Sequence, residues 1–167
     1  MEYALDEIDR NIIKVVQKQP NITQTDIAKK VERSQPTIGM RVDHLKDMGV
    51  LQFQAGVNLK LVDLYLAQVE IETNHTEEIL DLVKECPLMV NAFRLSGPKN
   101  INIILASRKI AHLDKIVNHH FRNNSLVKSA TMNVITDFVE DFIMPMDLEF
   151  EECNCDLKEE CIKYWKD

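Results

Sequence analysis

The sequence predicts an α+β fold, with an N-terminal helical domain, a small α/β sandwich and a tail that contains most of the cysteines. Apolar residues recur at helical spacing up to residue 45, and strand-like and helical patterns then follow in the order β-α-β-β-α-β between residues 65 and 140. Beyond residue 140 the chain is acidic and holds three of its four cysteines. We therefore divide it into a helical domain at 1–50, a linker at 51–64, a sandwich at 65–140 and a tail at 141–167.

The composition is that of a folded protein. Of the 167 residues, 45% are hydrophobic, with only 4 glycines and 5 prolines, which excludes collagen-like and low-complexity classes. No stretch approaches the 18 or so charge-free apolar residues of a membrane span, and the acidic N-terminus lacks the apolar run of a secretory signal. We expect no membrane association, a cytoplasmic location and reduced thiols.

The net charge of -7 is concentrated in the tail. Residues 1–56 have a net charge of 0 and residues 57–136 of +1, whereas residues 137–167 have a net charge of -8. The negative total therefore does not argue against a nucleic-acid partner for the first domain.

The first 50 residues contain three amphipathic helical patterns. Pro20 ends the first pattern, and Thr23 and Ser34 are placed to cap the second and third helices. Pro36 falls in the first turn of the third helix, and Gly49 stands where a C-terminal cap is expected. The expected buried positions are Leu5, Ile8, Ile12, Val15, Ile27, Ala28, Val31, Ile38, Val42 and Leu45.

A short helix, a turn and a longer helix form the pattern of a helix-turn-helix. The second helix of such a pair reads the major groove of double-stranded DNA with its N-terminal residues, where Gln bonds adenine, Arg bonds guanine or phosphate, and Thr or Met meets a thymine methyl. The alternative is a three-helix packing module with no DNA partner. The residues predicted to contact DNA are Ser34, Gln35, Pro36, Thr37, Met40, Arg41 and His44.

The same segment resembles the N-terminal domain of the Lrp/AsnC (leucine-responsive, or feast/famine) transcription regulators. The motifs that carry the resemblance are Leu5-Asp6-x-x-Asp9-x-x-Ile12, Thr25-Asp26-Ile27-Ala28, Ser34, Arg41-Val42-x-x-Leu45 and Gly49-Val50-Leu51. The resemblance implies a winged helix-turn-helix, a β-strand linker, and dimers that bind palindromic operator DNA.

The sandwich is predicted as strand 65–72, helix 76–86, strands 89–95 and 101–106, helix 110–121 and a last strand at about 129–139, after a linker strand at 51–54. This is a ferredoxin-like order. It resembles the effector and oligomerisation domain of the same family, which implies a homodimer and higher assembly to a tetramer or octamer. In that family the turn between the second and third strands carries a glycine, an aromatic residue and an aspartate, and helps bind an amino-acid effector. Gly97 matches, but Pro98, Lys99 and Asn100 supply neither the aromatic nor the acid, so an effector site at Gly97, Lys99 and Asn100 remains an alternative.

The tail places Cys153, Cys155 and Cys161 in a C-x-C-x5-C pattern among six carboxylates. The negative surroundings disfavour bare thiolates and would be offset by a bound metal. We favour an iron–sulfur cluster (3Fe-4S or 4Fe-4S) on these three cysteines. The alternatives are zinc, a disulfide and incidental thiols in a solvated tail. For zinc the fourth ligand would be Cys86, His112, His119, His120 or a residue of a partner chain.

The remaining candidate residues have plainer interpretations. Cys86 is expected to be a small buried hydrophobe, and each histidine a surface or cap residue. Ile162, Tyr164 and Trp165 could dock the tail on the sandwich. The chain has no catalytic motif, and we expect no enzyme.

These observations predict a DNA-binding regulator of Lrp/AsnC type that senses redox, iron or sulfur state through a metal centre on the tail. The first alternative is an amino-acid-responsive regulator with a structural zinc site in the tail. The second is an electron-carrying or assembly protein that retains a helix-turn-helix.

Overall fold

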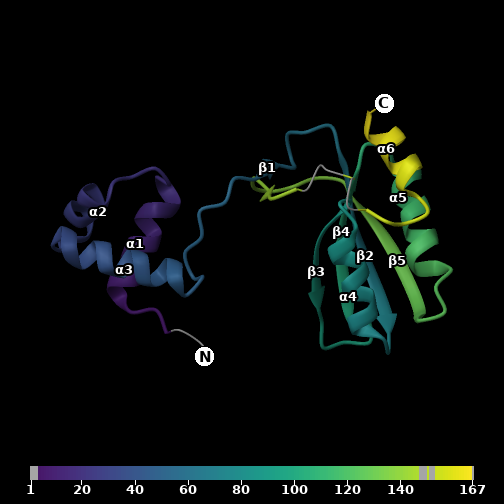
Figure 1. Cartoon of the computed structure of the whole chain (residues 1–167), viewed down its shortest axis with the longest axis horizontal. Coiled ribbons are helices and arrows are strands. Elements are labelled where there is room, and N and C mark those ends of the chain that lie inside the picture. Colours follow the sequence, from purple (N-terminus) through teal and green to yellow (C-terminus); the bar gives the residue numbers. More distant parts are fainter. Residues whose placement is uncertain (1–3, 147–149, 151–152, 167) are drawn as a thin grey trace. The chain divides into compact units, whose positions relative to one another are not determined.

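The computed structural model describes residues 4–146, 150 and 153–166, which fold into two compact units that meet between Gln54 and Ala55. Figure 1 shows a helical first unit and an α/β arrangement in the second. Within the described part of the chain, no helix is long and apolar enough to cross a membrane.

The first unit consists of α1 (Glu7–Lys18), α2 (Gln24–Val31) and α3 (Gln35–Asp47). Each helix begins at a side-chain cap, because Asp6, Thr23 and Ser34 accept hydrogen bonds from the backbone N–H groups three residues ahead. The predicted caps at Thr23 and Ser34 are therefore confirmed. The buried core of the unit is formed by Ile12, Val16, Ile27, Ala28, Ile38, Val42, Leu45 and Leu51.

The end of α3 explains why the strand predicted at 51–54 does not form. Gly49 has a positive φ of 68°, and the N–H groups of Val50 and Leu51 both donate to the Leu45 carbonyl at 3.0 Å. Leu51 is thereby folded back into the helical core. The apolar alternation at 51–54 reflects this anchoring, and the linker strand lies instead at β1 (Val57–Asn58).

The second unit contains an antiparallel sheet of β2 (Tyr65–Thr73), β3 (Met89–Arg94), β4 (Ile101–Ser107) and β5 (Val127–Ile135), in the order β3-β4-β2-β5. The connecting helices are α4 (Thr76–Glu85) and α5 (Ile110–Val117), the latter continued by a π-helical turn at Asn118–Arg122. Both helices contribute to a core with the inward residues of β2 and β4. The ferredoxin-like β-α-β-β-α-β order is confirmed.

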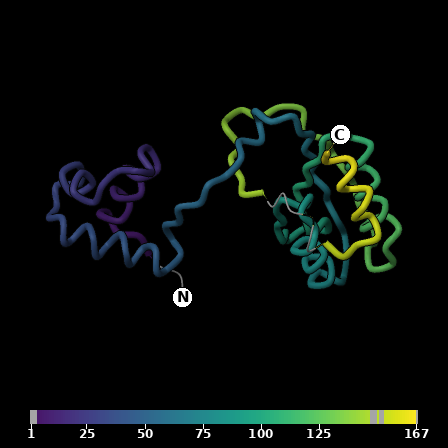
Figure 2. The backbone as a smooth tube through the Cα atoms, turned by 45° about the horizontal axis from the view of Figure 1, so that its top comes forward, coloured from purple at the N-terminus to yellow at the C-terminus, as the bar shows by residue number. Residues whose placement is uncertain are grey.

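Two elements at the end of the chain were not predicted from the sequence. The last sheet strand ends at Ile135, and the chain then forms β6 (Ile143–Met144), which pairs antiparallel with β1. The tail ends in α6 (Lys158–Lys166), which lies beside α5 in Figures 1 and 2.

The sheet face opposite the helices carries exposed apolar side chains. A shallow hollow on this face is lined by Gln68, Phe93, Leu95, Asn102, Ile104 and Ile135. Phe93 and Leu95 are 48% and 46% exposed, which is unusual for side chains of this size. The face therefore presents an exposed apolar patch that includes Phe93 and Leu95.

Candidate functional sites

The α2–α3 pair has the geometry of a helix-turn-helix. Glu32 ends α2 in the left-handed region at φ 55°, and Ser34 caps α3 two residues later. The two helices lie so close that a Cβ on Gly39 of α3 would meet Gln24 Oε1 of α2 at 3.1 Å. The tight turn and the glycine contact together fix the crossing of the pair.

The outward side of α3 presents most of the residues predicted to contact DNA. Gln35, Pro36, Met40 and His44 are exposed, with Met40 at 71%. The Ser34 and Thr37 hydroxyls lie 2.7 Å apart, and Ser34 Oγ also caps the helix by accepting from the Thr37 N–H. The first turn of α3 is thus ordered by these two residues, and the side chains available to reach bases come from the other four.

Arg41 has a structural role that the sequence did not reveal. Its guanidinium donates to Asp6 Oδ2 at 2.5 Å and to Asp9 Oδ1 at 3.0 Å, and Asp9 is 1% exposed. Asp6 and Asp9 also form the capping box of α1. The hydrogen bond from the Asp9 N–H, and next the one from the Arg41 guanidinium, lower the pKa of the Asp6 carboxyl. The Asp6-x-x-Asp9 and Arg41 motifs therefore tie α1 to α3.

Sequence reasoning also passed over Arg33, which is exposed in the turn directly before α3. Its guanidinium donates to the Glu32 carbonyl at 2.9 Å. Phosphate contacts commonly come from basic side chains at the start of a recognition helix. Its position in the turn was the available signal.

The tail thiols lie against the second unit, two of them close to each other and the third close to a histidine. Cys153 Sγ and Cys155 Sγ are 3.5 Å apart, and Cys161 Sγ lies 3.3 Å from His112 Nε2. Cys153 and Cys161 are buried and Cys155 is half-buried, and all are free thiols. The tail is therefore a docked part of the unit, as the three apolar residues near its end suggested.

The docking of α6 on α5 rests on several different contacts. The Tyr164 ring stacks on the His112 ring with centroids 4.4 Å apart, and Lys109 Nζ lies 5.4 Å from the centre of the same tyrosine ring. Lys115 pairs with Glu160, and Arg108 Nη1 donates to the Trp165 carbonyl at 3.1 Å. These contacts hold Cys161 in place.

Two histidines expected at the surface are buried. His112 is 2% exposed, because α6 covers its face of α5. Its Nδ1 lies 2.8 Å from Ser107 Oγ, within hydrogen-bond distance. His120 is 9% exposed, and the π-helical turn rotates it inward. Burial lowers both pKa values, that of His120 to about 4. His75 does lie at a helix cap, at the start of α4.

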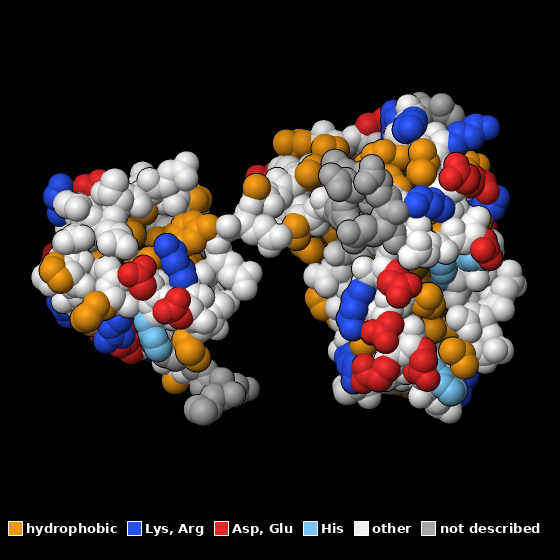
Figure 3. Space-filling view, in the orientation of Figure 1, with side chains coloured by type: hydrophobic (Ala, Val, Ile, Leu, Met, Phe, Trp, Pro, Cys, Tyr) orange, Lys and Arg blue, Asp and Glu red, His pale blue; other side chains and the backbone are white. Residues whose placement is uncertain are grey.

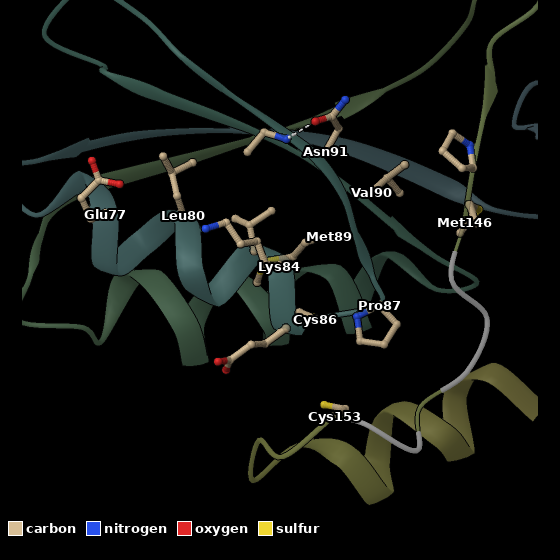
Figure 4. Close-up of a pocket in the computed structure, with 14 residues that line it drawn as sticks. Glu77, Leu80, Lys84, Cys86, Pro87, Met89, Val90, Asn91, Met146 and Cys153 are labelled. Carbon is tan, nitrogen blue, oxygen red and sulfur yellow. Dashed lines mark hydrogen bonds between the residues drawn. The ribbon is translucent and has the colours of Figure 1, made fainter. Parts of the chain in front are cut away.

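Cys86 lies close to the tail thiols although it is distant from them in sequence. It ends α4 and lines the same pocket as Cys153 (Figure 4). Burial, with a smaller contribution from negative charge on Cys153 and Cys155, raises the pKa of the Cys86 thiol to about 11. Burial, with smaller contributions from the other three thiols, raises the pKa of Cys161 to about 12. Cys86 is buried, as predicted.

The thiols are near one another without yet surrounding a single point. Among the residues that the structure describes, no three His, Cys, Asp or Glu side chains are arranged to hold a metal ion as they stand. Metal binding would have to draw the thiols together through the loop that joins Cys153 to α6.

The turn predicted to bind an effector is occupied by internal contacts. Lys99 Nζ donates to Ser129 Oγ at 2.6 Å, and the Asn100 amide bonds both the N–H and the carbonyl of Thr73, at 3.1 and 2.7 Å. Gly97 faces open space, with nothing within 4 Å of a Cβ placed there. Lys99 and Asn100 thus fasten the turn to β5 and β2.

Comparison with known proteins bears on the first unit and then on the whole fold. Residues 5–52 match the winged helix-turn-helix DNA-binding family. A curated relative, an uncharacterized HTH-type transcriptional regulator of Pyrococcus furiosus, is 28% identical over 83 residues. The match covers 48% of this chain, and the chain spans about half (51%) of the length of that relative.

Solved structures are similar over most of the chain. Escherichia coli AsnC superposes with a TM-score of 0.67 at 18% identity, covering 83% of this chain and 96% of AsnC. The chain has the fold of the Lrp/AsnC regulators. A Neisseria meningitidis transcriptional regulator, solved as a complex with L-Met, gives the same TM-score of 0.67 at 20% identity, covering 82% of this chain and 93% of that regulator. The fold implied by the resemblance to the Lrp/AsnC family is confirmed. Several of the similar proteins are named as transcriptional regulators.

Proposed function

We propose that the chain is a sequence-specific DNA-binding transcription regulator of Lrp/AsnC type. The observation that carries this proposal is the helix-turn-helix at residues 24–47, whose second helix keeps Gln35, Met40 and His44 exposed on one side while Ile38 and Val42 hold the opposite side in the core. That arrangement leaves a rigid helix free to enter a major groove. Arg33 adds a positive charge beside the helix start, where a phosphate would lie.

The test is the selection of bound sequences from a random double-stranded DNA pool with the full chain, followed by affinity measurements at several salt concentrations. A regulator enriches a palindromic sequence, and its affinity falls steeply with salt. Gln35→Ala should weaken binding to the selected site by roughly 10- to 100-fold, since one good base contact is worth about 1–3 kcal/mol. Gln17→Ala, at an exposed position of α1, is the matched control and should leave affinity unchanged. Equal binding to all sequences would contradict the proposal.

The DNA-binding form is proposed to be a homodimer that forms higher oligomers. The support is the open sheet face, where Phe93 and Leu95 remain about half exposed. Phe93→Glu would place a charge on this face and should convert the assembly to a smaller species in sedimentation. An unchanged sedimentation coefficient would place the subunit contact elsewhere.

The regulatory centre is proposed to lie in the tail, with an iron–sulfur cluster on Cys153, Cys155 and Cys161 that makes operator binding respond to redox, iron or sulfur state. The supporting observation is that the three thiols are docked against the folded unit rather than extended into solvent. A state of the tail can bias the rest of the assembly only through such contacts. The test is the iron and sulfide content of protein purified without oxygen, and operator affinity with the cluster present and removed.

One observation favours the alternative, in which the tail holds a structural zinc ion and a small molecule is the effector. The 3.5 Å between Cys153 Sγ and Cys155 Sγ is close to the separation of two thiolates on one tetrahedral zinc, about 3.8 Å for Zn–S bonds of about 2.3 Å. Thiolates on different irons of a cluster lie farther apart. About one zinc per chain, with operator binding that responds to an amino acid, would select this alternative.

A further inference from the structure

We infer that Cys86 is the fourth thiol of the tail metal site, so that the site joins the tail to the end of α4. The inference rests on the proposed metal centre and adds its missing ligand. Cys86 stands 67 positions before Cys153 in the sequence. The fold nevertheless brings these two cysteines to one pocket, which both line (Figure 4).

The position of Cys86 suits a ligand. It is the C-terminal cap of α4, directly before Pro87 and β3, so its backbone is fixed by a helix on one side and by a strand of the sheet on the other. Its side chain is 9% exposed. The Cys86 backbone carbonyl accepts from the Met89 N–H at 3.0 Å, which closes the turn between the helix and the strand. A thiol held in this way offers a metal ion a ligand of fixed position.

Two of the other three thiols lie on a loop, and the third lies on the helix that follows it. Cys153 and Cys155 precede α6 in a loop, where Cys153 N–H bonds the Phe150 carbonyl at 3.2 Å and Lys158 N–H bonds the Cys155 carbonyl at 3.0 Å. Cys161 lies in the first turns of α6, facing the core. Because the contacts of α6 hold Cys161 in place, closing four thiols around one centre requires a shift of the loop that carries Cys153 and Cys155.

His112 competes with Cys86 for the fourth position, and its contacts favour a supporting role. Its Nδ1 bonds Ser107, its Nε2 faces the Cys161 sulfur, and its ring is stacked on Tyr164. These three contacts hold the ring in one plane, where an Nε2–H can donate to a metal-bound Cys161 sulfur. Hydrogen bonds to ligating sulfurs tune a centre without occupying a coordination position.

A site of four cysteines is a known donor set both for zinc and for an iron–sulfur cluster. Four thiolates leave either centre with a net negative charge, so acidic side chains nearby do not by themselves favour it. Figure 3 shows carboxylates together with basic side chains over the part of the second unit where α4 lies, and the first turn of α6 contains Glu159 and Glu160. The shared chemistry is a thiophilic metal bound by four thiolates.

The test uses the reduced full chain, freed of metal by a chelator under anaerobic conditions and titrated with Co²⁺. We expect one Co²⁺ per chain, with the sulfur charge-transfer and visible bands of a tetrahedral thiolate site. Cys86→Ser should weaken Co²⁺ binding by more than about 100-fold and alter both sets of bands, because losing even a supporting contact costs about 10- to 100-fold. Cys86→Ala should do the same, and the emission of the single tryptophan checks that each variant is folded.

His112→Gln is the discriminating control. If Cys86 is the ligand, this variant keeps the thiolate bands of the wild type and loses at most about 100-fold in affinity. Wild-type bands and affinity in Cys86→Ser, or loss of the site in His112→Gln alone, would overturn the inference. Reconstitution with Fe²⁺ and sulfide in place of Co²⁺, scored by visible absorption, tells a cluster from a single ion, and Cys86→Ser should prevent it as well.

The results separate this inference from the proposed function. Metal bound by the three tail cysteines with no effect of Cys86→Ser refutes the inference and leaves the metal centre standing. Metal bound through Cys86 with no change in operator affinity supports the inference and refutes the sensing role. A full chain that takes up neither Co²⁺ nor a cluster refutes both.

Discussion

The burial of His120 makes the stability of the second unit depend on pH in a window where few other groups titrate. Its side chain is 9% exposed, and burial, with a smaller effect from His119, lowers its pKa to about 4 from an ordinary value of 6.5. Between these two values the unfolded chain binds a proton that the folded chain does not. The free energy of unfolding therefore decreases as the pH falls from 6.5 towards 4, and this contribution is fully present only above 6.5.

The size of the effect follows from the two pKa values. Linkage gives a loss of about 2 kcal/mol by pH 5 and an upper limit of about 3 kcal/mol near pH 4. His112, whose pKa is also lowered by burial, adds a loss of the same sign. His120→Gln should remove its own share of the dependence, so that wild type and variant differ less in stability at pH 5 than at pH 7.

The assay is urea unfolding of the full chain at pH values from 7 to 5. Emission is followed from Trp165, the single tryptophan, which packs against the same core as Phe121. His75→Gln is the control, because His75 is about half exposed at the start of α4. A wild-type stability that stays constant between pH 6.5 and 5, or an NMR titration of His120 with a midpoint near 6.5, would refute the reasoning.

Three further predictions concern contacts that hold separate elements together. Arg41→Met should lower the urea midpoint of the first unit in the absence of DNA, because Asp9 is buried and loses its guanidinium; a variant of wild-type stability that binds DNA poorly would instead make Arg41 a DNA contact. Gly56→Ala should separate β1 from β6 at a cost of about 1–3 kcal/mol, because the new Cβ would lie 3.0 Å from the Met144 backbone; unchanged amide protection at Val57 and Asn58 would argue against this. Tyr164→Ala should loosen α6, so that Cys161 in metal-free protein is alkylated faster than in wild type, whereas an equal rate would mean that the tyrosine stack does not hold the helix.

The parts of the fold that the sequence could predict are those determined by local patterns. Thr23 and Ser34 cap helices through bonds to residues three positions away, so their role is readable from spacing alone. β2 alternates in its second half, whereas β4 is buried along nearly its whole length, and both were predicted as short apolar runs bounded by turn residues. Short α6 lacked such a signal, since its apolar residues are few and lie among charges.

The parts that could not be predicted depend on contacts between distant residues. Arg41 was assigned to DNA from its place on a helix, whereas its partners Asp6 and Asp9 are more than 30 positions away. His120 was expected to be a surface or cap residue, whereas it is buried in a π-helical turn that local spacing did not predict. The approach of Cys86 to the tail likewise depends on the completed fold.

The pairing of β1 with β6 brings the strand that enters the second unit next to the strand that precedes the tail. Val57 is the partner of Met144, and Asn58 that of Ile143, while the Leu59 N–H bonds the Phe142 carbonyl at 2.8 Å. The backbone that comes from the helical unit and the backbone that departs toward the thiols are thus adjacent in one two-stranded ribbon. A displacement of β6 therefore acts directly on β1, its partner strand in the linker. Eight residues of chain separate Met144 from Cys153, so a displacement of the tail would reach this ribbon before it reached the four-stranded sheet.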